Sequence, residues 1–511
     1  MASNNSEQTF YWYDFETFGL NPRFDRPAQF AGMRTDLNFN PIGDGEVFYN
    51  RPSKDYLPSF QSILITGITP QQCDTEGMSE EEFARQIWQR FNTPGTISLG
   101  YNTLHFDDEV CRFLFWRNFL DPYTHQWKND CSRWDIFPLT CAVWSLRGDS
   151  IKWPTWQDAA SYGIAGAENR EGYCFKLECL TRANSMEHMK PHDALSDVVG
   201  TMALARLIAQ KEPRLWQWAL ENRHKDKVKE ALAKGPVLWI DPRHGQKRGF
   251  ARLVLMIGMN AQKGNEAFVW DLSHDPEELK GLSPEEWQQR LFPSREAVAG
   301  GIRPLPIYRL AINGSPFVCS SLAVLSDERA AKYGIDKAKA VEHAEKLSPM
   351  LATLQGPLTY FSEHAVLPSE SNIDLALYSI GFPSNADKER IVRVRAGDGD
   401  YLARAVEKRE IVFENTRYND LLLRYRARNW PESLSDRDRE AWLAHCREQL
   451  LNDQGSPRSM TKFQEEIDRV VEASQENEAV IELAEKLYNW GEYLCELAQG
   501  AEDNGPEEDI G

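Results

Sequence analysis

The chain has 511 residues, of which 41% are hydrophobic and 26% charged, a composition that excludes an intrinsically disordered protein and leaves room for about three domains. Its 58 basic and 77 acidic residues give a formal net charge of −19 at pH 7. The molecule as a whole therefore repels nucleic acid, and a polyanionic partner would have to be held locally, for example by divalent metal ions that bridge carboxylates to phosphate.

The first nine residues are polar, without a basic segment followed by an apolar one, and no apolar run in the chain approaches the length of a membrane span. We therefore expect a cytoplasmic protein that makes no membrane contact, and we expect a monomer. The nine cysteines include no Cys-x-x-Cys pair. In a long cytoplasmic chain this predicts reduced thiols rather than a disulfide framework or a zinc knuckle.

The stretch Phe10–Thr17 is predicted to form a strand, because bulky aromatic residues favour strands. The side-chain period of a strand is two, so Asp14 and Glu16 are expected on one face, with Tyr13 and Phe15 on the other. Two carboxylates side by side are costly to bury unless a cation or proton neutralises them. On this pair alone, a site for a hard metal ion and a solvated acidic edge strand are equally good interpretations.

The rest of the region 1–211 mixes strand-like and helical runs, which predicts an α/β domain. A short strand over Thr96–Asn102 is followed by a helix over Asp108–Phe119, with Asp107 at the N-cap position. A second, well-buried helix is predicted over Asp193–Ile208, and Asp197 lies inside it. Between them, Ser145–Cys174 has little periodicity and is predicted to be a long irregular surface segment, a kind of segment that is often functional.

Residues 213–362 begin with a locally basic stretch and continue with β-type runs, including Arg252–Ile257 and Ala267–Trp270, which predict a small barrel-like β domain. The basic stretch Arg223–Lys229 fits a solvated helix face and a DNA or partner surface equally well. Helical patterns dominate residues 364–499, which predict a third, helical domain. The final residues 500–511 are predicted to be a disordered acidic tail.

Four carboxylates and one histidine stand out in the first region: Asp14, Glu16, Asp107, Asp197 and His192. Four carboxylates balance the charge of two divalent ions, and a pair of ions about 3.5–4 Å apart activates water and stabilises the leaving oxygen in phosphodiester cleavage. His192 directly precedes the predicted helix and has a side chain suited to take the proton from that water.

The motifs around these residues resemble those of the DEDDh 3′-to-5′ exonucleases. They are Asp14-Phe-Glu16-Thr, Asn102-Thr-Leu-His-Phe-Asp107 and His192-Asp-Ala-Leu-Ser-Asp197. Further stretches, among them Asp25-Arg-Pro-Ala-Gln-Phe30, Leu64-Ile-Thr-Gly-Ile-Thr-Pro70 and Arg426-Ala-Arg-Asn429, resemble the bacterial exonuclease I family in particular. The resemblance extends over all three proposed domains and leaves only the acidic tail unmatched.

This resemblance implies an RNase H-like α/β exonuclease domain (1–211), an SH3-like β domain (213–362) and an all-α C-terminal domain (364–499) around a groove for single-stranded DNA. It implies a 3′-to-5′ exodeoxyribonuclease of DNA repair and recombination that releases 5′-mononucleotides. It also implies two Mg²⁺ ions per site, with Mn²⁺ as a substitute, and a partner, the C-terminal tail of the single-stranded-DNA-binding protein.

Carried over residue by residue, the resemblance makes Asp14, Glu16, Asp107 and Asp197 the metal ligands and His192 the general base. Glu16 and Lys176 would contact the nucleotide, although Lys176 stands where the family carries Arg and so lacks the bidentate fork. Positions that contact DNA in the family are Arg112, Tyr123 and Trp127, and one further such position, which can be Arg, is Cys141 here.

Two groups of residues could add to the DNA surface. Arg424, Arg426 and Arg428 alternate with Tyr425 and Ala427, a cationic and aromatic mix suited to a DNA strand. A helix cannot place all three arginines on one face, so an alternative is that some of them bind carboxylates of a neighbouring domain. Trp153 and Trp156 suit base stacking and packing equally well.

Two alternative functions are open at this point. A DEDDh exoribonuclease or proofreading exonuclease would share the five site residues but would lack the domains after residue 212. A non-catalytic scaffold for single-stranded DNA would have lost a metal ligand, and none is lost here.

Overall fold

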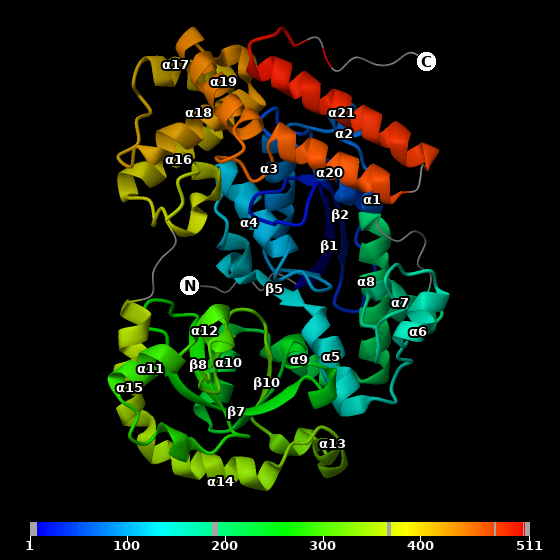
Figure 1. The fold of residues 1–511 in the computed structure, drawn as a ribbon, viewed down its shortest axis with the longest axis vertical. Coiled ribbons are helices and arrows are strands. Elements are labelled where there is room, and N and C mark those ends of the chain that lie inside the picture. The colour runs from blue at the N-terminus through cyan, green and yellow to red at the C-terminus, as the bar shows by residue number, and fades with distance from the viewer. Residues whose placement is uncertain (1–7, 187–192, 365–368, 475–476, 504, 506–511) are drawn as a thin grey trace.

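The protein folds into three parts that follow one another along the chain (Figure 1). The computed structural model describes residues 8–186, 193–364, 369–474, 477–503 and 505. In Figure 1 an α/β part, blue to cyan, lies between a small β part in green and a helical part that runs from yellow to red. The predicted fold class, an α/β domain followed by a β domain and a helical domain, is confirmed.

A five-stranded mixed sheet forms the centre of the α/β part, in the order β3-β2-β1-β4-β5. The middle strand β1 pairs antiparallel with β2 and parallel with β4. The aromatic run that predicts β1 occupies this central position because its rings are buried on both faces of the sheet. The strands are β1 (Thr9–Thr17), β2 (Pro27–Thr35), β3 (Glu46–Tyr49), β4 (Thr96–Gly100) and β5 (Ser132–Asp135).

Helices cover both faces of this sheet. On one face Tyr13 and Phe15 of β1 share a core with α3 and α4, and on the other Phe10 and Trp12 share a core with α5 and α8. The helices of this part are α1 (Phe60–Thr66), α2 (Pro70–Glu76), α3 (Glu80–Phe91), α4 (Asp107–Arg117), α5 (Ile136–Arg147), α6 (Trp156–Ser161), α7 (Leu177–Ala183) and α8 (Ala194–Lys211).

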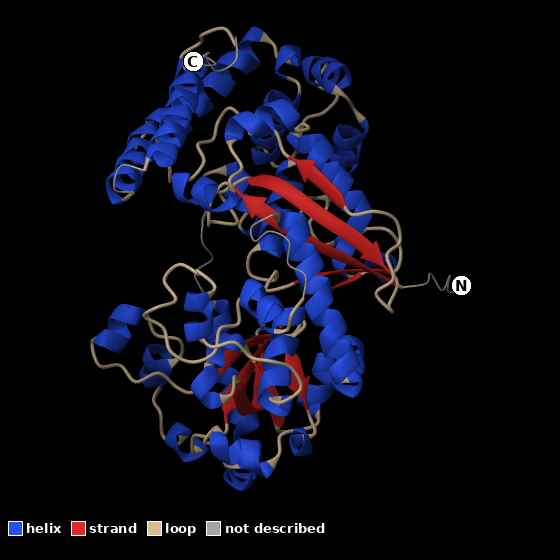
Figure 2. Ribbon diagram, turned by 90° about the vertical axis from the view of Figure 1, so that its right-hand side faces the viewer, coloured by secondary structure: helices blue, strands red, loops and turns tan. Residues whose placement is uncertain are grey.

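The β part contains a second five-stranded sheet, antiparallel throughout, in the order β10-β6-β7-β8-β9. Figure 2 shows the two sheets as separate red layers. The two parts nevertheless share one core, since Trp144 of α5 contacts the rings of Phe250 and Tyr333. The strands are β6 (Val237–Ile240), β7 (Ala251–Met259), β8 (Glu266–Asp271), β9 (Ile307–Ala311) and β10 (Phe317–Cys319), and the helices are α9 (Pro213–Asn222), α10 (Lys225–Ala233), α11 (Pro284–Arg290), α12 (Arg295–Ala299), α13 (Asp327–Lys332), α14 (Lys337–Leu347) and α15 (Leu351–Glu363).

The helical part packs on the α/β part through a core that joins Phe60 and Ile63 of α1 to Phe463 of α20 and Leu487 of α21. Its helices are α16 (Asn385–Ala396), α17 (Gly399–Glu407), α18 (Arg417–Asn429), α19 (Asp436–Leu451), α20 (Met460–Ala473) and α21 (Glu478–Ala498). The 3₁₀-helices of the protein are η1 (Thr124–Gln126), η2 (Lys128–Asp130), η3 (Pro242–His244), η4 (Gln246–Arg248), η5 (Pro276–Leu279), η6 (Leu322–Val324), η7 (Ser348–Met350), η8 (Ile373–Tyr378) and η9 (Pro431–Ser433).

Two local expectations differ from the structure. Asp107 is the first residue of α4 rather than its N-cap, which is Phe106 and makes no side-chain capping bond. The segment Ser145–Cys174 is not wholly irregular, because its first residues finish α5 and its middle forms α6. A capping box between Thr155 and Asp158 starts α6 by satisfying backbone N–H groups at the helix end.

The predicted disordered tail lies partly outside the described residues, at 504 and 506–511. Within the described part, Asp503 accepts a hydrogen bond from the Tyr493 hydroxyl of α21. All nine cysteine side chains are buried, and none forms a disulfide in the described chain. Among the helices that the structure describes, none has the length and apolar character needed to span a membrane.

Candidate active site

Strand β1 places the first two acidic residues of the site. Asp14 and Glu16 project from the same face, and their carboxylate oxygens lie within 4.8 Å of one another and of a carboxylate oxygen of Asp197. Glu16 is buried and Asp14 partly buried. Both stand near the end of β1, beyond its pairing with β4, which runs from Thr9 to Trp12 on β1. The prediction that Asp14 and Glu16 lie side by side on one face of the strand is confirmed.

The start of α4 supplies the third carboxylate. Asp107 is buried, and its Oδ1 accepts a hydrogen bond from the backbone N–H of Phe15, 3.3 Å away, which ties it to β1 between Asp14 and Glu16. The neighbouring Asp108 serves another purpose. It accepts a hydrogen bond of 2.6 Å from Tyr13 and forms an ion pair with Arg133 of β5. Although burial acts to raise it, Arg133 holds the pKa of Asp108 below its ordinary value, so Asp108 is a structural anion.

Helix α8 supplies the fourth carboxylate, Asp197, in its first turn. Asp193 is the N-cap of this helix and accepts a hydrogen bond from Ser196 N–H at 3.1 Å. The next residue, Ala194, donates its backbone N–H to the Gln29 side chain of β2 at 3.2 Å, so the helix start is fixed to the sheet beside β1. The predicted general base, His192, lies outside the described residues.

The electrostatics of this group are those of crowded, buried anions. Burial, followed by repulsion from Asp107, Asp197 and Glu16, raises the pKa of Asp14 well above its usual range. Burial and repulsion from Asp197 raise the pKa of Glu16 to about 8. Burial raises the pKa of Asp107 to about 8 as well. Among the described residues, no Lys or Arg forms an ion pair with Asp14, Glu16 or Asp107.

Such a group fits divalent metal ions. Carboxylate oxygens are the ligands that Mg²⁺ prefers, and a bound cation would remove the repulsion that raises these pKa values. Three of the four predicted ligands, Asp14, Glu16 and Asp197, form one of the two groups of His, Cys, Asp or Glu in the described chain that are close enough to hold an ion together. The fourth, Asp107, is adjacent through its bond to Phe15.

A cavity of about 540 Å³ opens beside these carboxylates. It is lined by Asp14 and Asp197, by the segment between α6 and α7, and by residues of the β part. Lys176, the predicted nucleotide contact, lies on its wall, and its Nζ is 3.5 Å from Oε1 of Glu178. Sequence reasoning missed Glu178 and Gln246, which also line the cavity, because nothing in their local sequence distinguishes them from surface residues.

The three predicted DNA contacts of the α/β part lie along α4 and the segment that follows it. The guanidinium carbon of Arg112 is 5.7 Å from the centre of the Tyr123 ring, and Arg112 also pairs with Glu109 at 2.5 Å. Trp127 is 67% exposed, an unusual degree for so large an apolar side chain. An aromatic ring that is open to solvent, such as that of Trp127, suits the stacking of an unpaired base.

The predicted DNA surface of Arg424, Arg426 and Arg428 requires a correction. Arg428 is buried and pairs with Asp55 at 2.7 Å and with Asp374 at 2.5 Å. Arg426 is buried and pairs with Asp438 at 2.9 Å, and Arg424, although partly exposed, pairs with Asp374 at 3.0 Å. A buried guanidinium that already pairs with carboxylates does not meet a phosphate. Arg428 joins the helical part to the α/β part through Asp55, whereas Arg424 and Arg426 pair with carboxylates of the helical part itself.

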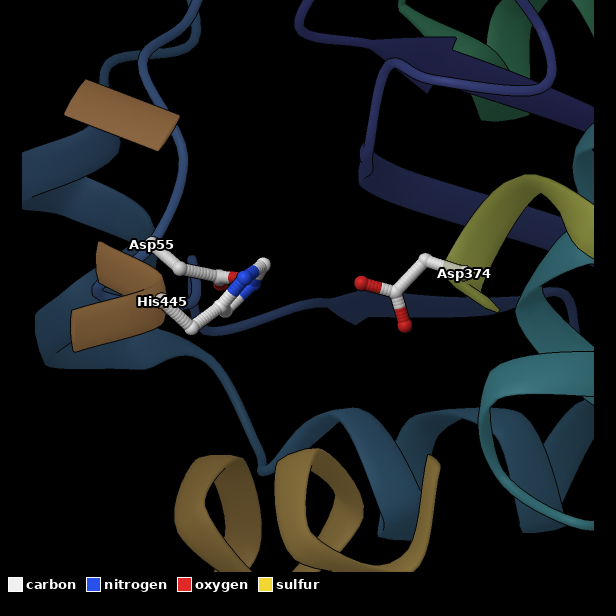
Figure 3. Close-up of side chains that lie close together, drawn as sticks. All are labelled: Asp55, Asp374 and His445. Carbon is white, nitrogen blue, oxygen red and sulfur yellow. The ribbon is translucent and has the colours of Figure 1, made fainter. Parts of the chain in front are cut away.

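The carboxylates that they bind form the second acidic group of the described chain. Asp55 precedes α1, Asp374 lies in η8 and His445 in α19, and in Figure 3 the Asp374 carboxylate points towards the other two side chains. The imidazole Nε2 of His445 is 3.1 Å from Asp55 Oδ2. Arg428 lies between the two carboxylates, and so this group is neutralised by the protein itself.

Comparison with known proteins shows which proteins the whole chain is related to. Three family profiles match: Exonuclease over residues 11–205, Exonuclease I SH3-like domain over residues 223–359 and Exonuclease I C-terminal domain over residues 371–494. The exodeoxyribonuclease I of Haemophilus influenzae is 34% identical over 487 residues, which cover 94% of this chain and 98% of that protein.

Solved structures agree with this relationship. A crystal structure of Escherichia coli exonuclease I in complex with a dA16 oligonucleotide superposes with a TM-score of 0.85 at 32% identity, covering 95% of this chain and all of that one. A crystal structure of SSB/exonuclease I in complex with the inhibitor CFAM superposes with a TM-score of 0.82 at 32% identity, covering 96% of this chain and all of that one.

Proposed function

The chain belongs to the exonuclease I family, and from that premise we propose that it removes 5′-mononucleotides one after another from the 3′ end of single-stranded DNA. The observation that carries the proposal is the group of Asp14, Glu16, Asp107 and Asp197, which β1, α4 and α8 bring together beside a nucleotide-sized cavity. Four clustered carboxylates are what phosphodiester hydrolysis by two metal ions requires.

We assign the four carboxylates as ligands of two Mg²⁺ ions, for which Mn²⁺ is an acceptable substitute. When bound, such ions supply a water nucleophile at neutral pH and neutralise charge on the phosphate. The backbone N–H of Phe15 orients Asp107, and the fixed start of α8 orients Asp197. We assign proton removal from the water to His192, which directly precedes the N-cap of α8 in the sequence, and we assign contact with the nucleotide to Glu16 and Lys176.

The substrate specificity follows from the surface beyond the cavity. Trp127 offers an exposed aromatic ring, and Arg112, beside Tyr123, offers a cation. Such groups stack on and bind unpaired nucleotides, whose bases are exposed, whereas the bases of a duplex are already stacked on one another. The similar protein from E. coli was crystallised with a single-stranded oligonucleotide, which supports the same substrate here. The similar SSB/exonuclease I structure supports the C-terminal tail of the single-stranded-DNA-binding protein as a partner, and with it a role in DNA repair and recombination.

The test is hydrolysis of matched single-stranded DNA, RNA and duplex DNA, each labelled once at the 5′ end and once at the 3′ end. We expect Mg²⁺-dependent shortening of the 5′-labelled single strand, early release of the 3′ label as a mononucleotide, and no reaction in EDTA. Equal cleavage of RNA would favour an exoribonuclease, and release of the 5′ label first would reverse the direction. Binding of single-stranded DNA without cleavage would make the chain a scaffold.

A further inference from the structure

The cavity beside the catalytic carboxylates has a wall that the assigned residues leave unexplained. The assigned metal ligands Asp14 and Asp197 line it, but the lining also includes Trp156, Arg170 and Tyr173. All three belong to the segment between α5 and α7. A nucleotide whose scissile phosphate lies at the carboxylates must direct its sugar and base into the remaining space, so these residues are positioned to meet it.

The segment is built to hold this wall in place. Trp156 is the first residue of α6, which starts with a capping box and packs on a small core of its own formed by Ala159, Ile164, Ala167, Cys174 and Cys179. At the other end, Tyr173 exchanges two hydrogen bonds with Gln246 of the β part: its N–H donates to Gln246 Oε1 at 2.9 Å, and its carbonyl accepts from Gln246 Nε2 at 2.6 Å. The wall is therefore anchored to both parts of the protein.

Arg170 lies on this wall, and no carboxylate of the described residues neutralises its charge. Its guanidinium carbon is 4.6 Å from the centre of the Trp156 ring, a cation–π contact that fixes its position. The residue is exposed, and among the described residues it forms no ion pair. Arg182 of α7 makes a similar contact, with its guanidinium carbon 5.7 Å from the centre of the Tyr162 ring, but it does not line the cavity.

A guanidinium plane stacked on an indole offers its second face to another flat group. Arginine planes stack on nucleobases, and stacking tolerates any sequence because every base has a π-face. An exonuclease that removes every nucleotide in turn needs that tolerance, whereas hydrogen-bond readout of base edges would restrict it. The pairing of Trp156 with Arg170 on the cavity wall meets this requirement.

We propose that Arg170, positioned by Trp156, stacks on the base of the 3′-terminal nucleotide and holds it in the cavity for cleavage. This inference rests on the proposed function, since it concerns the nucleotide that is being removed. Arg170 would touch the substrate directly, and Trp156 would act through Arg170 as a positioning residue.

The test measures the first cleavage of a short single-stranded oligonucleotide by the full-length protein with Mg²⁺, under single-turnover conditions. Two substrates are compared, one with an intact 3′-terminal adenine and one whose 3′-terminal nucleotide is abasic. We expect Arg170→Ala to raise the protein concentration for half-maximal rate on the intact substrate by roughly tenfold, with little effect on the abasic one. Arg182→Ala, which removes the same charge outside the cavity, should leave both substrates unchanged.

Trp156 is tested by two substitutions. Trp156→Phe keeps a ring under the guanidinium and should stay within about threefold of the wild type, whereas Trp156→Ala should reproduce the base-dependent loss of Arg170→Ala. Equal losses on both substrates, no loss in Arg170→Ala, or the same loss in Arg182→Ala would overturn the proposal. These outcomes are distinct from failure of the proposed function, in which the wild-type protein itself would not shorten the intact strand.

Discussion

Two groups of acidic residues in this protein look alike in composition and differ in what surrounds them. Asp14, Glu16 and Asp197 form one, and Asp55, Asp374 and His445 form the other. In the first, burial and mutual repulsion raise the pKa of Asp14 and Glu16, and no Lys or Arg of the described chain pairs with either. In the second, burial acts in the same direction, but Arg428 prevails and holds the pKa of Asp55 and of Asp374 well below the ordinary range.

The difference teaches how to tell a metal site from a structural ion pair. Proximity of carboxylates is common to both groups, so proximity alone does not identify a ligand set. Arg428 neutralises the carboxylates of the second group, whereas Asp14 and Glu16 pair with no Lys or Arg of the described chain and can accept a metal ion. On this basis we propose the first group, and not the second, as the metal site.

The largest expected effect is loss of catalysis when a carboxylate of the first group is removed. Asp14→Asn should lower Mg²⁺-dependent cleavage of single-stranded DNA by at least about 10³-fold, because one ligand fewer leaves the ions poorly held. In EDTA the same substitution should leave the thermal midpoint unchanged or higher, since it relieves repulsion. Turnover close to wild type at ordinary Mg²⁺ concentrations would refute the ligand assignment.

The second group should respond in the opposite way. Arg428→Met leaves Asp55 and Asp374 buried without their main cation, and we expect a loss of about 3–5 kcal/mol in the free energy of unfolding, measured with urea. Asp14→Asn is the control, because Asp14 pairs with no Lys or Arg among the described residues. A loss below about 1 kcal/mol in Arg428→Met would contradict the structural role of the second group.

The two groups also predict opposite dependences of stability on pH. A raised pKa means that the stability contribution of Glu16 is complete below its unfolded pKa of 4.5 and is lost as the pH rises through about 8. The depressed pKa values of Asp55 and Asp374 mean that their contribution is complete above their unfolded pKa of 3.8 and is lost as the pH falls through the lower folded values.

Urea unfolding in EDTA measures this contrast. The wild-type protein should lose stability, by a few kcal/mol at most, between about pH 5 and pH 9, and Glu16→Gln should reduce that slope. Below pH 4 both proteins should lose stability together, because both keep the second group. If the loss of stability with rising pH is the same in Glu16→Gln as in the wild type, the pKa of Glu16 is not raised in the folded protein.

The smallest expected effect concerns the outer cation of the second group. Arg424 is partly exposed and binds Asp374, which also has Arg428. Arg424→Ala should therefore cost only about 1 kcal/mol of stability by urea unfolding, far less than Arg428→Met. Equal losses of stability in the two variants would mean that Arg424 and Arg428 contribute equally to neutralising Asp374, and that Arg428 is not the main cation of the second group.

The sequence alone predicted the domain order and most of the site. The spacing of Asp14 and Glu16 required one strand face for both, and the helices that carry Asp107 and Asp197 were visible from their apolar periodicity. The prediction for Arg428 is wrong because one of its partners is remote in the sequence: Asp55 lies 373 positions before it. Local patterns do not contain such pairs, and they equally conceal that Arg170 stacks on Trp156 at the wall of the cavity.

The central claim is that the protein holds its metal ions at the first acidic group and not at the second. Its most direct test is a calorimetric titration with Mn²⁺ of the wild-type protein, Asp14→Asn and His445→Gln, all at the same pH. We predict two ions bound by the wild type and by His445→Gln, and binding at least about tenfold weaker in Asp14→Asn. Unchanged binding in Asp14→Asn, or loss of an ion in His445→Gln, would contradict the account.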